Sequence, residues 1–174
     1  MQIKLETTHL ILRPISTADA QDFFELDSNP EVHRFLGNNT VKSIEDSKDM
    51  IVKILEQYQT KSVGRLAIID KTTKAFLGWC GLKYEENLRE EFNYYDLGYR
   101  LKPKYWGNGY ATEAAIASLN YGFKDLKLKE ICAAADVNNK ASNIILQKIG
   151  MTVSEKFMHK GQLCNWYTIK STNL

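Results

Sequence analysis

Two glycines separated by one residue stand between an expected strand and an expected helix, in the segment Trp106-Gly107-Asn108-Gly109-Tyr110-Ala111-Thr112. Glycine permits positive φ angles and lets a ligand come close to the backbone. The first turn of the following helix presents N–H groups that have no partner inside the helix, and the helix dipole adds partial positive charge there. Together these properties suit a phosphate or pyrophosphate group.

Taken alone, this glycine pair leaves other interpretations open. A P-loop requires Gly-Lys followed by Ser or Thr, which Asn108-Gly109-Tyr110 does not supply. A dinucleotide-binding fingerprint requires Gly or Ala at Thr112 and a place after the first strand of a βαβ unit, and the segment meets neither condition. A glycine turn without any ligand explains the pair about as well as a phosphate site does.

A second informative segment runs from Asn139 to Gly150. Asn139 is a typical helix N-cap, and Gly150 is typical of the position just after a helix. Apolar residues between them recur at helical spacing, which predicts a short amphipathic helix. The pattern is complete without a function, so a purely structural role also remains open.

The elements around these segments predict the fold. Strands are expected over 5–15, 64–70, 75–84, 92–101, 130–137, 152–159 and 163–170, and helices over 18–26, from a capping box at Ser43 and Asp46, over 111–126 and over 139–150, with a short helical piece after Pro30. Three consecutive antiparallel strands precede a βαβ-type crossover. This order predicts an α+β (mixed α/β) fold, in which one mostly antiparallel seven-stranded sheet is flanked by about four helices. Residues 1–174 are expected to form a single domain.

Composition narrows the function classes. The chain has 174 residues and a net charge of +2 from 23 basic and 21 acidic residues, which does not favour a nucleic-acid or membrane binder. Its three cysteines are widely spaced, so neither a disulfide framework nor a metal site is expected. The N-terminus lacks the apolar stretch of a signal peptide, and no run approaches the roughly 18 apolar residues of a membrane span. A cytoplasmic protein is expected.

Four motifs in this order resemble the GNAT acetyltransferase superfamily, and most closely its RimJ/RimL-like branch, which acetylates ribosomal-protein N-termini and other amines. The motifs are T-H-L-I-L-R-P at 8–14, D-L-G-Y-R-L at 96–101, Y-W-G-N-G-Y-A-T-E-A at 105–114, and N-K-A-S at 139–142 with K-I-G-M at 148–151. The resemblance spans nearly the whole chain. Three positions depart from the wider pattern: Trp106 replaces Gln or Arg, Met151 replaces Phe, and Leu146 stands where the superfamily has a general-acid tyrosine.

The resemblance implies direct transfer of an acetyl group from acetyl-CoA to a primary amine in a ternary complex. It assigns the pyrophosphate to the main chain of 106–112, the pantetheine amides to the main chain of Leu101 and Lys102, and the pantetheine arm to Asn139. Ser142 is expected near the thioester sulfur as a proton donor. The implied cofactor-binding set is therefore Leu101, Lys102, Trp106, Gly107, Asn108, Gly109, Tyr110, Ala111, Thr112, Asn139 and Ser142.

The chemistry also needs a base and an oxyanion donor. Asp96 matches the family's strand glutamate and is favoured as general base, with Glu85, Glu86, His159 or a relayed water as rivals. A bulged strand N–H near 98–99 is expected to bind the oxyanion.

The acceptor and the function class stay open. The acceptor is expected to be a protein N-terminus, possibly ribosomal, or a small-molecule amine, with no nucleic-acid or membrane partner. Homodimerisation is undecided. A non-catalytic acyl-CoA sensor and a nucleotide-binding protein of another class remain alternatives.

Overall fold

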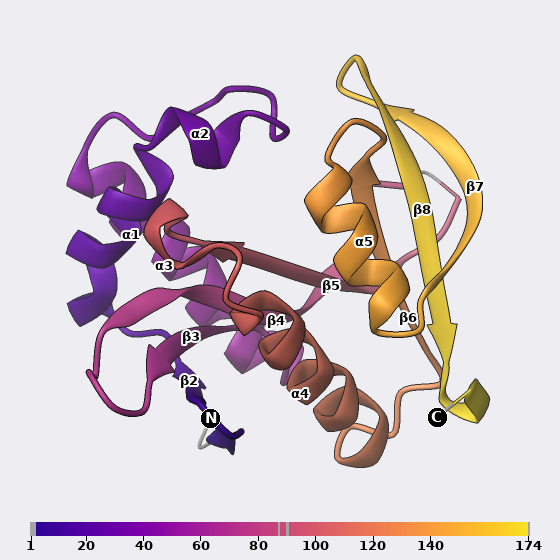
Figure 1. The fold of residues 1–174 in the computed structure, drawn as a ribbon, viewed down its shortest axis with the longest axis horizontal. Helices are drawn as coiled ribbons and strands as arrows, with labels where there is room; N and C mark the ends of the chain where they lie inside the picture. The colour runs from indigo at the N-terminus through magenta and orange to yellow at the C-terminus, as the bar shows by residue number, and fades with distance from the viewer. Residues whose placement is uncertain (1–2, 87, 90, 174) are drawn as a thin grey trace.

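The computed structural model describes residues 3–86, 88–89 and 91–173 (Figure 1). One eight-stranded sheet runs through the molecule in the order β1-β2-β3-β4-β5-β6-β8-β7. Every neighbouring pair in it is antiparallel except β5 and β6. The strands are β1 (Leu5–Glu6), β2 (Leu10–Pro14), β3 (Arg65–Asp70), β4 (Phe76–Glu85), β5 (Tyr94–Leu101), β6 (Glu130–Asp136), β7 (Thr152–His159) and β8 (Gln162–Lys170).

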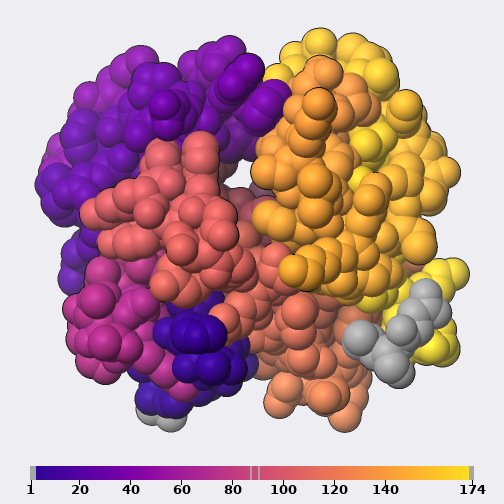
Figure 2. Space-filling view, viewed as in Figure 1, coloured from indigo at the N-terminus to yellow at the C-terminus, as the bar shows by residue number. Residues whose placement is uncertain are grey.

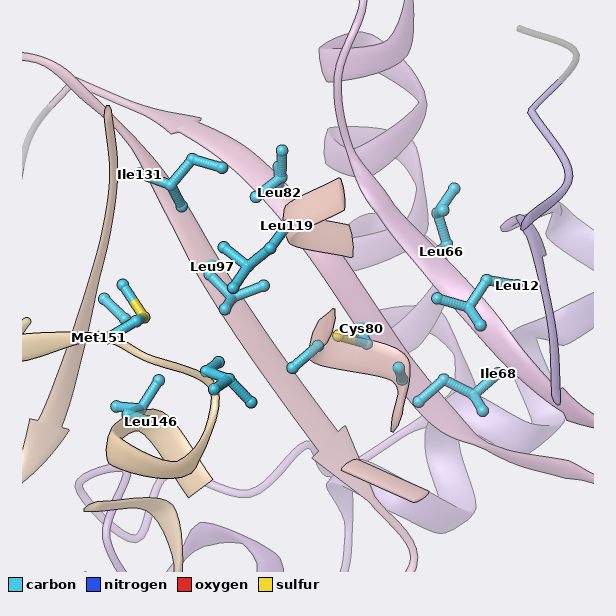
Figure 3. Close-up of a cluster of buried hydrophobic side chains, with 14 of the residues drawn as sticks. Leu12, Leu66, Ile68, Cys80, Leu82, Leu97, Leu119, Ile131, Leu146 and Met151 are labelled. Carbon is cyan, nitrogen blue, oxygen red and sulfur yellow. The ribbon is translucent and has the colours of Figure 1, made fainter. Parts of the chain in front are cut away.

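The helices cover both faces of this sheet. They are α1 (Ala20–Asp27), α2 (Pro30–His33), α3 (Ile44–Thr60), α4 (Tyr110–Lys124) and α5 (Lys140–Lys148). Alternation along β3 separates two cores, because Ala67 packs with the α1 and α3 residues Phe23 and Ile51, whereas Leu66 and Ile68 face the other side. On that other side Leu97, Leu119 and Leu146 join β5, α4 and α5 in the larger core (Figure 3).

The expected α+β fold with a mostly antiparallel central sheet is confirmed, and two details differ. The single strand expected over 5–15 is divided, because the Thr7 hydroxyl accepts a hydrogen bond from the Leu10 N–H at 3.0 Å and stabilises a turn. Within the described residues the sheet therefore has eight strands and not seven. The piece after Pro30 forms a one-turn helix that ends at His33, so the described residues contain five α-helices. The capping box of Ser43 and Asp46 is present as predicted.

The parallel neighbours β5 and β6 separate almost at once. They share one register pair, Asp96 with Cys132, while β5 remains paired with β4 from Glu85↔Tyr94 to Gly78↔Leu101 without a register shift. The β6-facing edge of β5 is therefore open beyond Asp96. The bulge expected near 98–99 is absent, since the open edge comes from divergence of the strands and not from an extra residue.

Other expectations concern membranes, metals and thiols. None of the helices within the described residues is long and apolar enough to cross a membrane. Those residues also contain no group of three or more His, Cys, Asp or Glu side chains placed to hold a metal ion. Cys80, Cys132 and Cys164 are buried free thiols, as expected from their spacing.

Candidate active site

The glycine loop after β5 adopts the backbone geometry that its residues predict. Gly107 and Gly109 have φ angles of 77° and 81°, and Gly109 is the N-cap of α4. These left-handed conformations favour glycine because a side chain there is strained. A Cβ atom added at either glycine would meet no atom within 4 Å, so the backbone of the loop borders open space.

The N–H groups of this loop are unpaired. Among the described residues, none of the six N–H groups from Gly107 to Thr112 donates a hydrogen bond, and the first bond of α4 runs from the Glu113 N–H to the Gly109 carbonyl at 3.0 Å. The loop is held from its other side, because the Trp106 indole N–H donates to the Leu101 carbonyl at 2.8 Å. Fixed N–H donors at a helix N-terminus form an anion-binding site.

Some of the main-chain groups predicted to bind pantetheine already have hydrogen-bond partners within the protein. The Leu101 carbonyl already accepts from Trp106, and the Lys102 N–H donates to the Leu77 carbonyl at 2.9 Å. The Lys102 carbonyl accepts from the Tyr105 N–H at 3.0 Å. A carbonyl oxygen has two lone pairs, so both carbonyls retain capacity to accept one further hydrogen bond.

The Lys102 side chain has a role that sequence reasoning missed. It is buried against α1, where its ammonium group contacts Asp22 and Glu25, each at 2.7 Å. Burial pushes the pKa of Lys102 down, but the two carboxylates more than reverse this and raise it above its ordinary value. The lysine therefore fixes the end of β5 to the N-terminal helices.

On the α5 side of the open edge, two predicted residues lie together. The Asn139 side chain accepts a hydrogen bond from the Ser142 N–H at 3.1 Å, so it caps α5. The Ser142 Oγ lies 2.9 Å from the hydroxyl of Tyr99, which reaches across from β5. Figure 2 shows a hollow in this part of the molecule, between the violet N-terminal helices, the salmon chain that follows β5 and the orange α5. Sequence reasoning assigned Tyr99 no such contact.

The favoured base, Asp96, lies on the opposite face of β5 from Tyr99, because the two residues are three positions apart in a strand. Its carboxylate forms an ion pair with Arg65, which also donates to the Asp96 carbonyl at 2.8 Å and to the Gly81 carbonyl. Burial raises the pKa of Asp96, and Arg65 opposes the rise. Asp96 is therefore a poorly solvated, ion-paired carboxylate.

Arg65 was not predicted from sequence, although a signal for it exists. Gly81 and Gly98 face each other across β4 and β5, and a Cβ atom at Gly98 would lie 2.7 Å from the Arg65 guanidinium group. The glycine pair leaves the space in which the arginine crosses the sheet. Two facing glycines in a predicted hairpin indicate such a close approach.

The rival bases divide into two groups. Glu85 is largely buried, contacts Lys83 at 2.6 Å and lies on the same face as Asp96. Burial and the charge of Lys160 lower the pKa of His159, and the charge of Glu85 opposes that effect. Glu86 instead pairs with Lys61 at 3.0 Å on the surface. The fold thus places Asp96 and Glu85 on one face of the sheet and leaves Glu86 outside this group.

A buried charge cluster joins α1 and α2 to β5. The Asp27 carboxylate, with no exposed surface, contacts Arg100 and accepts from His33 at 3.3 Å. The Arg100 guanidinium group stacks over the Trp79 ring at 5.1 Å. Burial and the charge of Arg100 lower the pKa of His33, and Asp27 opposes the shift. The cluster sets where the N-terminal helices sit beside the hollow.

Comparisons with known proteins identify the family of the chain. The family model "Acetyltransferase (GNAT) domain" matches residues 9–152. "Uncharacterized N-acetyltransferase YoaA" of Bacillus subtilis (strain 168) is 37% identical over 146 residues, which cover 84% of this chain and 81% of the relative. The chain belongs to the GNAT acetyltransferase family and is an acyltransferase.

Solved structures share the fold at low sequence identity. The RimL ribosomal L7/L12 α-N-protein acetyltransferase in complex with coenzyme A superposes with a TM-score of 0.82 at 16% identity, covering 97% of this chain and 98% of that one. The spermidine N-acetyltransferase of Vibrio cholerae, in complex with CoA and spermine, gives a TM-score of 0.78 at 17% identity, with 96% and 98% covered.

The His33 environment predicts a pH-dependent stability. A folded-state pKa below the unfolded value of about 6.5 means that the unfolded chain binds the proton first, so the free energy of unfolding falls as pH drops below about 6.5. His33→Gln removes this term and loses about 1–3 kcal/mol at pH 7, because a buried hydrogen bond is weakened. Urea denaturation between pH 7 and 5 measures both effects. The exposed His9, as His9→Gln, is the control, and an equally steep acid loss in His33→Gln would contradict the assignment.

Proposed function

We propose that this protein transfers an acetyl group from acetyl-CoA directly to a primary amine within a ternary complex. The observation that carries the proposal is the run of six unpaired N–H groups from Gly107 to Thr112 beside open space. Acetyl-CoA supplies a thioester whose carbonyl carbon accepts the amine and whose thiol leaves. The chain's own residues bind and orient the donor, remove a proton from the amine and assist departure of sulfur.

The loop has the number of hydrogen-bond donors and the sign of charge that suit a pyrophosphate group. Two adjacent phosphates carry several acceptor oxygens, and the loop offers consecutive N–H donors together with the positive end of the α4 dipole. Gly107 and Gly109 add no side chain that would obstruct the ligand. From this position the pantetheine arm is directed along the open edge of β5, past the carbonyls of Leu101 and Lys102 and toward Asn139 and Ser142.

We assign the general base and the hydrogen-bond donor to the sulfur to opposite faces of β5. An amine attacks only when neutral, and its unperturbed pKa is about 8 for an α-amine and about 10.4 for a lysine-type amine. Asp96 is the base we favour, because burial raises its pKa and makes it a stronger base than an exposed carboxylate. Glu85, His159 and a relayed water are its rivals. Ser142, on the side of β5 that carries Tyr99, donates a hydrogen bond to the sulfur, in place of the full proton transfer that the family resemblance implies.

Within the family we place the chain in the RimJ/RimL-like branch, as a single domain over 1–174 that acts in the cytoplasm. The motifs at 96–101 and 105–114 support this branch. Two acceptor classes are retained. The RimL structure acts on a ribosomal protein N-terminus and the Vibrio cholerae structure holds spermine, so both chemistries occur on this fold.

Turnover with a small set of acceptors tests the proposal. We expect acetyl-CoA to release its thiol, with formation of an N-acetylated product, on a peptide with a free N-terminal alanine, on spermidine or on phenethylamine. A colour reaction measures the released thiol, and mass spectrometry identifies the acetylated product. Tight binding of acetyl-CoA without turnover on any of these acceptors would contradict the enzyme proposal and favour the acyl-CoA sensor. Thermal stabilisation by ATP or NAD but not by acetyl-CoA would favour a different nucleotide ligand.

A pair of glycine substitutions tests the pyrophosphate site. Gly109→Ala and Gly161→Ala strain backbones of nearly the same φ, 81° and 80°, and neither new Cβ atom meets a neighbour within 4 Å. Both should lose about 1 kcal/mol of stability, because alanine is unfavourable at positive φ. Only Gly109→Ala should weaken CoA binding, by at least tenfold in calorimetric titration. Equal CoA affinity in the two variants would exclude this loop as the pyrophosphate site.

A further inference from the structure

The side chain of Tyr99 connects the two separated arms of the sheet. Its hydroxyl lies 2.9 Å from the Ser142 Oγ, where either oxygen can donate, and it is also placed to donate to the Ser142 carbonyl at 3.2 Å. Tyr99 belongs to β5, and Ser142 belongs to the first turn of α5, which follows β6. The contact therefore spans the gap that opens where β5 leaves β6, next to the proposed path of the acyl donor.

Ser142 is held at two points, its main chain and its hydroxyl group. The Asn139 cap fixes the Ser142 main chain, and Tyr99 fixes its Oγ. A serine hydroxyl carries one donor and two acceptor sites. When the phenol donates to the Oγ at the shorter of the two distances, the serine hydrogen is left free to donate to a third group.

We propose that Tyr99 is a positioning residue for the transfer step, which directs the Ser142 hydrogen toward the sulfur of the acyl donor and strengthens that hydrogen bond. The inference rests on the proposed function. Chained hydroxyl groups polarise one another, so a serine that accepts from tyrosine is a better donor to developing negative charge.

The phenol acts without losing its proton. Burial raises the pKa of Tyr99, and the hydrogen bond with Ser142 only partly opposes the rise, so the side chain stays neutral across the working pH range. In the step, the amine nitrogen forms a bond to the acetyl carbon and the carbon–sulfur bond breaks, with its electron pair on sulfur. The proton lost by the nitrogen goes to the base, and sulfur gains a proton from solvent. Ser142 and Tyr99 keep theirs.

At the position where the wider family has a general-acid tyrosine, this chain has no hydroxyl group. Leu146 stands there, is 1% exposed and packs in the main core with Leu97 and Met151. Among the described residues, Tyr99 is the only side chain that forms a hydrogen bond with the Ser142 Oγ. Tyr99 of β5 therefore supplies a phenol hydroxyl next to α5, in which Leu146 supplies none.

Tyr99→Phe tests the inference by removing one oxygen atom. With acetyl-CoA and the fastest acceptor among the alanine-initiated peptide, spermidine and phenethylamine, kcat should fall about threefold to tenfold, which corresponds to one hydrogen bond. The KM for acetyl-CoA should stay within about twofold. Tyr95→Phe is the matched control, because Tyr95 lies on the same strand and face and packs against Tyr84 at 5.1 Å. It should leave kcat unchanged.

A double-mutant cycle with Ser142→Ala separates positioning from general structural support. Because Tyr99 is proposed to act through Ser142, the Tyr99→Phe substitution should have almost no further effect on kcat in the Ser142→Ala background. Melting temperatures of all variants establish that they are folded. An unchanged kcat in Tyr99→Phe, or the same fold loss in both backgrounds, would overturn the inference while wild-type turnover upholds the proposed function. Absence of turnover in the wild-type protein would overturn both.

Discussion

The early separation of β5 from β6 is the constraint on which the rest of the site depends. The two parallel strands share one register pair, Asp96 with Cys132, and β5 then follows β4 alone. A parallel pair needs a crossover helix, and here α4 provides it and begins at the glycine loop. The separation therefore produces an open strand edge, a helix N-terminus at its end and a gap faced by α5.

Buried or half-buried basic side chains from β3 and from the end of β5 fix the neighbouring elements in position beside this edge. Arg65 crosses β4 to Asp96, Arg100 contacts Asp27 at the end of α1, and Lys102 contacts Asp22 and Glu25. Breaking one partner of such a pair is costly because it leaves an uncompensated buried charge. The N-terminal helices are thereby fixed beside the hollow.

Much of this could be predicted from the residues in the chain. The glycine pair, the Asn139 cap and the capping box at Ser43 are local patterns, and each has the predicted geometry. The contacts that sequence reasoning missed are all long-range. Arg65 with Asp96 and Tyr99 with Ser142 join residues 31 and 43 positions apart, so each pair meets only once the fold has placed its elements together. The expected oxyanion bulge was wrong for the same reason, since an open edge produced by divergence leaves no mark in the local sequence.

A structure of the complex with coenzyme A tests the central claim most directly. We predict that the pyrophosphate oxygens lie about 2.7–3.2 Å from N–H groups between Gly107 and Thr112, with the pantetheine arm along the open edge of β5 and the sulfur beside Ser142. Coenzyme A bound elsewhere, with the N–H groups of this loop still facing solvent, would contradict it.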